Sequence, residues 1–132
     1  IVEAYRDAIW TIKTNMLYSK IKTTKSYASV LWLFGMYLFE KGNFEEALRY
    51  LEDASSIFDK LNIRDEDFYK CYTQLGKTYF MKYITEKNIA YLLKSREVSN
   101  RLYEERNNYA SNKTIKNHAT LLRNTLLRYS RL

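Results

Sequence analysis

Residues 28–54 read ASVLWLFGMYLFEKGNFEEALRYLEDA and contain the pattern that decides the fold. Apolar residues recur every three or four positions on both sides of residues 41–43, which predicts two helices joined by a short turn. Gly35 and Ala47 lack bulk, so we expect the two helices to approach each other closely at these positions. The segment therefore predicts an antiparallel helical hairpin.

The rest of the chain has the same helical periodicity. Proline is absent and glycine occurs only three times, so few positions force a break in a helix. Asn43 and Thr85 are the expected N-caps of the third and fifth helices. The sequence thus predicts an all-α fold of about six helices with short connections. They cover residues 1–19, 27–41, 43–61, 67–83, 85–106 and 111–131.

The segment 28–54 resembles the tetratricopeptide repeat, a hairpin of two helices. In that family a Trp-Leu-Gly-Tyr pattern marks the first helix, and a glycine turn precedes a second helix with two small alanines. The matching positions here are Leu31, Phe34, Gly35, Leu38, Gly42, Phe44, Ala47, Leu51 and Ala54. The resemblance implies a right-handed solenoid of antiparallel helical hairpins.

A second and less complete copy of the repeat begins near Tyr69. The residues that match it are Tyr72, Leu75, Gly76, Tyr79, Leu92 and Ser95. This copy departs from the family pattern at Tyr83, which stands for the turn glycine, and at Asn88, which stands for the small alanine. Gly35 and Gly76 are 41 residues apart, whereas the repeat has about 34 residues, so we expect longer helices.

The resemblance implies a single domain over residues 1–132. Residues 1–19 would be the second helix of a truncated repeat, 27–61 and 67–106 would be two repeats, and 111–131 would be a C-terminal helix. Each segment then packs against its neighbours in the sequence.

Elongated repeats of this kind are similar to the C-terminal sensory half of Gram-positive cytoplasmic regulators that respond to short signalling peptides. Because the chain begins at Ile1 rather than methionine, we expect it to be a piece of a larger regulatory protein. A single cysteine, Cys71, and the lack of a visible signal peptide favour a cytoplasmic setting. No apolar run is long enough to span a bilayer, so no membrane partner is expected.

In the tetratricopeptide family, the first helix of each hairpin lines a concave groove that holds a peptide or protein segment. The resemblance implies that a groove here is apolar at one end and basic at the other. Its ligand would be a short extended peptide with apolar residues and either a net negative charge or a free C-terminus. The groove residues carried over from the family pattern are Trp32, Met36, Phe39, Lys70, Thr73, Lys77 and Phe80.

No residue pattern predicts catalysis, a cofactor or a metal site. His118 is the only histidine, and Cys71 has no histidine near it in the sequence. The acidic pairs are adjacent in sequence, so their carboxylates diverge on a helix instead of converging on a metal or a proton. We therefore expect a binding protein and not an enzyme.

Two alternatives come from the charge distribution. The net charge is +7 overall, −4 over residues 34–66 and +5 over residues 101–132. The basic C-terminal part could bind nucleic acid, although its basic residues are expected to fall on several sides of the last helix, which makes that partner unlikely for this fragment. Alternatively, the chain is purely structural. It would then cap a solenoid, or form a homodimer in which the basic C-terminal part contacts the acidic residues 34–66.

Overall fold

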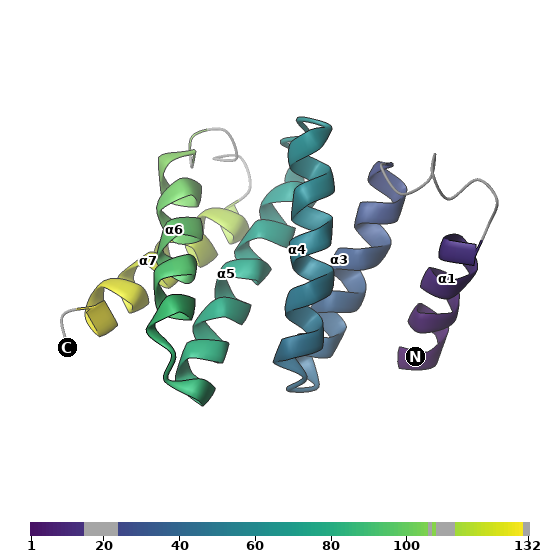
Figure 1. Cartoon of the computed structure of the whole chain (residues 1–132). Coiled ribbons are helices and arrows are strands. Elements are labelled where there is room, and N and C mark those ends of the chain that lie inside the picture. The colour runs from purple at the N-terminus through teal and green to yellow at the C-terminus, as the bar shows by residue number, and fades with distance from the viewer. Residues whose placement is uncertain (15–23, 106, 108–112, 131–132) are drawn as a thin grey trace. The chain divides into compact units, whose positions relative to one another are not determined.

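The computed structural model of the 132-residue chain describes residues 1–14, 24–105, 107 and 113–130. All regular structure in these residues is helical, in six helices with no strand, as the sequence predicts (Figure 1). The chain divides into two compact units, Ile1–Arg64 (unit 1) and Asp65–Leu132 (unit 2). Within the described residues, each unit contains one helical hairpin and one additional helix.

Unit 1 contains α1 (Val2–Thr14), α3 (Lys25–Glu40) and α4 (Phe44–Lys60). The helices α3 and α4 form a hairpin, and α1 packs against α3. Gly42 makes the turn possible because its φ of +81° lies in the left-handed region, which side chains disfavour. The predicted hairpin in residues 28–54 is therefore confirmed.

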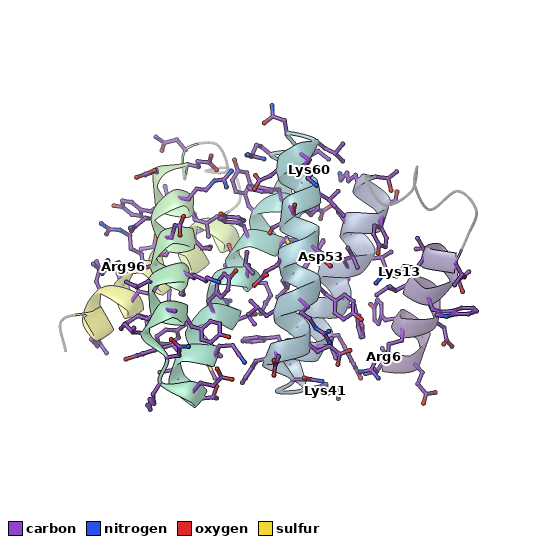
Figure 2. All side chains as sticks on the ribbon, viewed as in Figure 1. Arg6, Lys13, Lys41, Asp53, Lys60 and Arg96 are labelled. Carbon is purple, nitrogen blue, oxygen red and sulfur yellow. The ribbon has the colours of Figure 1, made fainter. Side chains whose placement is uncertain are left out.

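Aromatic rings and one ion pair join the three helices of unit 1. The ring of Phe34 is fully buried and lies 5.3 Å from the ring of Tyr5 on α1 and 4.7 Å from that of Tyr50 on α4. Arg6 of α1, labelled in Figure 2, donates two hydrogen bonds of 2.9 and 2.8 Å to the carboxylate of Glu46 on α4. These contacts fix α1 beside the hairpin through both apolar and charged groups.

Unit 2 contains α5 (Glu66–Glu86), α6 (Ile89–Glu104) and α7 (Lys113–Ser130). The helices α5 and α6 form the second hairpin, and α7 packs against both. Leu92 of α6 and Leu122 and Leu126 of α7 form a buried cluster, against which Phe80 and Tyr83 of α5 pack. This cluster is the point at which the three helices of unit 2 meet.

Both central glycines lie at close helix approaches, as predicted. A Cβ atom on Gly35 would lie 2.7 Å from Cγ of Leu51 and 3.2 Å from the carbonyl oxygen of Ala47. A Cβ atom on Gly76 would lie 2.8 Å from Cδ2 of Leu122 and 3.1 Å from Cγ1 of Val98. Neither position has room for a side chain unless a neighbour moves.

The turn of the second hairpin differs from the prediction. The expected helix end at Tyr83 is wrong, because α5 continues to Glu86. Thr85 was the expected N-cap of the next helix, but it lies inside α5, where its hydroxyl donates to the carbonyl of Met81 at 3.0 Å. Lys87 makes the turn with a φ of 58°, and Asn88 is the N-cap that accepts a hydrogen bond from the amide of Ala90. An asparagine cap after a left-handed residue thus replaces the expected threonine.

The other helix bounds agree with the prediction to within a few residues. The helix predicted to begin at residue 27 begins at Lys25, because the hydroxyl of Thr24 accepts a hydrogen bond from the amide of Tyr27. Asn43 precedes α4 as predicted, but its side-chain amide donates to Glu46 instead of capping the helix. The predicted parts of the first and last helices at 15–19, 111–112 and 131 lie outside the described residues.

Candidate functional site

The predicted groove residues of unit 1 lie on α3 and differ in exposure. Trp32 retains only 7% of its accessible surface, so its ring is not on an open face. Met36 and Phe39 are half-buried, and the ring of Phe39 lies 5.3 Å from that of Phe44 at the start of α4. Of these three residues, Met36 and Phe39 keep apolar surface that a ligand could cover.

The predicted groove residues of unit 2 lie on α5. Thr73 retains 4% of its surface, and its hydroxyl donates to the carbonyl of Tyr69 at 2.8 Å. Phe80 packs against the leucine cluster of α6 and α7. The hydroxyl of Thr73 is therefore used by its own helix, whereas Phe80 is only partly buried against the core of unit 2. That either residue faces a ligand stays a prediction.

Lys70 and Lys77 remain as the polar candidates on α5. They are seven residues apart, which is two helical turns, so they lie on the same side of the helix. Lys70 is exposed and its ammonium lies 2.7 Å from the carboxylate of Glu66. That hydrogen bond, together with the charge of Glu66, raises the pKa of Lys70. Its charge is already balanced by a neighbour.

Lys77 is in a different situation. It is half-buried, and removal of water from its ammonium lowers the pKa of Lys77 below 10.5. Among the residues that the structure describes, no carboxylate forms an ion pair with it. A cation that has lost part of its hydration and has no such partner gains more than an exposed one from an incoming anion.

The seven predicted residues therefore divide into two groups. Trp32 and Thr73 are buried, and Met36, Phe39, Lys70, Lys77 and Phe80 keep accessible surface. Three of the seven belong to unit 1 and four to unit 2. A single groove formed from all of them stays a prediction.

Of the two residues weighed for catalysis, the structure describes the side chain of one. Cys71 is fully buried in unit 2, and the side chain of His118 lies outside the described part of the structure. Among the described residues, no group of three or more histidine, cysteine, aspartate or glutamate side chains could hold a metal ion. Nor does any helix in this part of the chain have the length and apolarity to cross a membrane.

Sequence reasoning missed how the basic residues of the last helix are arranged. The expectation that they fall on several sides of that helix stays a prediction, because Arg131 lies outside the described residues. Lys113, Lys116 and Arg128 are exposed, and Lys113 and Arg128 lie on the side opposite the buried core residues of this helix. The guanidinium of Arg123 lies 4.0 Å from the ring centre of Tyr103 on α6, so this residue packs at the edge of that face. The buried positions Ala119, Leu122 and Leu126, recognisable from their spacing, were the signal that could have placed the basic residues.

Comparison with models of known protein families, with curated protein sequences and with solved structures finds no match to this chain. The tetratricopeptide resemblance thus rests on the residues quoted above.

Proposed function

We propose that this chain is a helical-hairpin module of the tetratricopeptide type that binds an acidic or free-carboxylate protein segment. The observation that carries the proposal is the half-buried ammonium of Lys77, which forms no ion pair with a described carboxylate. A ligand carboxylate would form an ion pair with this ammonium group. Water screens the charge of Lys77 less than it screens charges at the surface, which strengthens such a pair.

A separate apolar contact is proposed on α3 of unit 1. Met36 and Phe39 are three residues apart and share a face of that helix. Their half-buried side chains offer apolar surface without unpaired polar groups, and a flexible methionine beside an aromatic ring can adapt to different ligand side chains. The contributions of α3 and α5 are proposed separately, and each has its own variant.

The proposal is consistent with the resemblance to the tetratricopeptide family. Residues outside the proposed contacts have a structural role in it. Stacked helical repeats present side chains from successive helices to extended partners. A right-handed solenoid that continues into a larger cytoplasmic regulator is part of the same proposal. Binding by this chain is expected to be weak, since few residues contribute to it.

The test is a titration with a library of acetylated octapeptides that vary in apolar content, each made with a free C-terminal carboxylate and with a C-terminal amide. Binding is followed by the backbone amide shifts of the ¹⁵N-labelled protein. We expect binders to carry a carboxylate and to move the α5 amides around Lys77. In Lys77→Gln the affinity should fall about tenfold, as for loss of one charge-assisted hydrogen bond.

Two further variants test the role of charge and the apolar contact. Lys60→Gln removes an exposed ammonium at the end of α4, labelled in Figure 2, and should leave binding unchanged. Met36→Ala should weaken peptides with large apolar residues more than small ones. If no octapeptide binds, or if Lys77→Gln and Lys60→Gln bind equally well, the proposed function is wrong.

A further inference from the structure

The packing of α7 in unit 2 fixes which of its sides faces outward. Ala119, Leu122 and Leu126 are buried and face α5 and α6, and Leu122 lies against Gly76. Arg123 stacks on Tyr103 at the edge of this contact. Because these contacts set the rotation of α7 about its axis, the residues on the opposite side form a defined surface.

That surface contains a regular stripe of exposed residues, which we call the outer stripe: Lys113, Asn117, Leu121, Asn124 and Arg128. Their spacings of four, four, three and four residues keep them on one side of the helix. The stripe spans about 22 Å along the helix axis, at 1.5 Å per residue.

The order of residues in the outer stripe is informative. Leu121 stands at its centre with 65% of its surface exposed, the amides Asn117 and Asn124 flank it, and the cations Lys113 and Arg128 stand at the two ends. An apolar centre with a polar and charged rim is the layout of protein–protein contacts.

The charge on this face is of one sign only. The helix α7 has four basic residues and no acidic residue. Within the described part of the chain, Lys113, Lys116 and Arg128 form no ion pair. Lys113 and Arg128 only donate hydrogen bonds, whereas the amides of Asn117 and Asn124 both donate and accept them. The complementary surface should therefore present negative charge at the two ends of the stripe.

We infer that the outer stripe of α7 binds an acidic protein segment that carries an apolar side chain between its carboxylates. Carboxylates at the two ends of the segment meet Lys113 and Arg128, and the apolar side chain covers Leu121. In extended form a segment of about seven residues spans the stripe, at roughly 3.3 Å per residue. Leu121 favours protein over nucleic acid, because a phosphate backbone offers no apolar group to cover a leucine at this position.

This surface is separate from the Lys77 contact on α5, so each can fail alone. The probe is a fluorescein-labelled nonapeptide with two glutamates at each end and a central leucine, flanked by serines. Two matched probes are the same peptide with a central serine and a single-stranded oligothymidylate. Fluorescence anisotropy gives the affinities at 50 and 150 mM salt, and ¹⁵N shifts show which helix responds.

At 150 mM salt we expect the leucine peptide to bind about tenfold more tightly than the serine peptide, as for burial of one leucine side chain. Leu121→Ser should remove that difference, and Lys113→Glu should weaken both peptides. Lys60→Glu in unit 1 is the matched control and should change neither. These substitutions are at exposed positions, so circular dichroism should report an unchanged fold.

The inference is overturned if the oligothymidylate binds at 150 mM salt as tightly as the leucine peptide, because the face would then be a nucleic-acid surface. It is also overturned if Leu121→Ser binds the leucine peptide like the wild type, or if no probe shifts the α7 amides.

Discussion

The two hairpins solve the same packing problem with different residues. In α3–α4, a glycine on the first helix lies against an alanine carbonyl and a leucine on the second, at Gly35, Ala47 and Leu51. In α5–α6, the carbonyl of Gly76 accepts a 2.7 Å hydrogen bond from the buried hydroxyl of Ser95. The second hairpin thus adds a polar bond between its helices at the point where its glycine approaches the neighbouring helix.

The two hairpins also differ in helix length. The helix α3 ends five residues after Gly35, at Glu40, whereas α5 ends ten residues after Gly76, at Glu86. In an antiparallel hairpin, residues added to the end of the first helix must be matched at the start of the second. Accordingly, Ala47 is the fourth residue of α4 and Ser95 is the seventh residue of α6.

The largest effect is expected from Gly35→Leu. The new side chain would overlap Leu51 and the backbone of α4, so unit 1 should lose at least about 2 kcal/mol of stability. Trp32 is buried in unit 1 and Trp10 is exposed, so urea unfolding in a Trp10→Phe background reports on Trp32 alone. Ser56→Leu places a leucine at an exposed position of α4 and is the control. A Gly35→Leu protein with the wild-type midpoint would contradict the close approach.

Substitution of each glycine by alanine should change the stability of the two hairpins by different amounts. In both helices alanine gains about 1 kcal/mol of helix propensity over glycine. At Gly35 the new methyl group meets a side-chain branch point and a backbone oxygen, whereas at Gly76 it meets the terminal methyl of Leu122, which can turn away. We therefore expect Gly35→Ala to lose about 1 kcal/mol and Gly76→Ala to stay within about 0.5 kcal/mol of the wild type.

Each alanine variant has its own reporter. Trp32 fluorescence follows unit 1, and the rate at which the fully buried thiol of Cys71 reacts with a disulfide reagent follows the opening of unit 2. A larger loss of stability for Gly76→Ala than for Gly35→Ala would contradict this prediction.

A smaller effect is expected from Ser95→Ala. The substitution removes the hydroxyl that donates to Gly76 but leaves no cavity of note, and it should cost about 1 kcal/mol in unit 2. Faster reaction of Cys71, with unchanged Trp32 fluorescence, is the expected result. If Cys71 reacts no faster in Ser95→Ala than in the wild type, the hydrogen bond from Ser95 to Gly76 makes no net contribution to the stability of unit 2.

The smallest effect is expected from the titration of Lys77. Burial lowers its pKa in the folded state below 10.5, so the charged form is disfavoured by folding. The resulting destabilisation is fully present below the folded pKa and disappears as the pH rises through 10.5. Lys77→Met should therefore be more stable than the wild type at pH 7, and the gain should shrink towards pH 10.5 in urea titrations. A gain that is constant with pH would mean that packing, not charge, is responsible.

The first hairpin could be predicted from the sequence because its turn uses the residues that the geometry requires. Gly42 is the left-handed residue and Asn43 precedes the next helix. In the second hairpin Lys87 adopts the left-handed conformation, which sequence rules assign to glycine or asparagine, so the turn was placed too early. Asn88 was the available signal, since an asparagine before an apolar periodic run is a helix cap.

The candidate site was harder to predict than the fold. Positions carried over from a repeat pattern say which side of α5 a residue occupies but not which other helix covers that side. Phe80, for example, is partly buried against the cluster that includes Leu122 and Leu126 of α7. Spacing alone marks the apolar side of α7, but it does not say which side chains of α5 that side contacts.

The register of the second hairpin is the claim on which the assignments in α5 and α6 depend. Nuclear Overhauser effects from the α-hydrogens of the two glycines test it most directly. We expect cross-peaks from Gly35 to the methyl groups of Leu51, and from Gly76 to those of Val98 and Leu122. If the second hairpin had the same register as the first, Leu92 would lie opposite Gly76, as Leu51 lies opposite Gly35. Cross-peaks from Gly76 to Leu92, with none to Val98, would contradict the account.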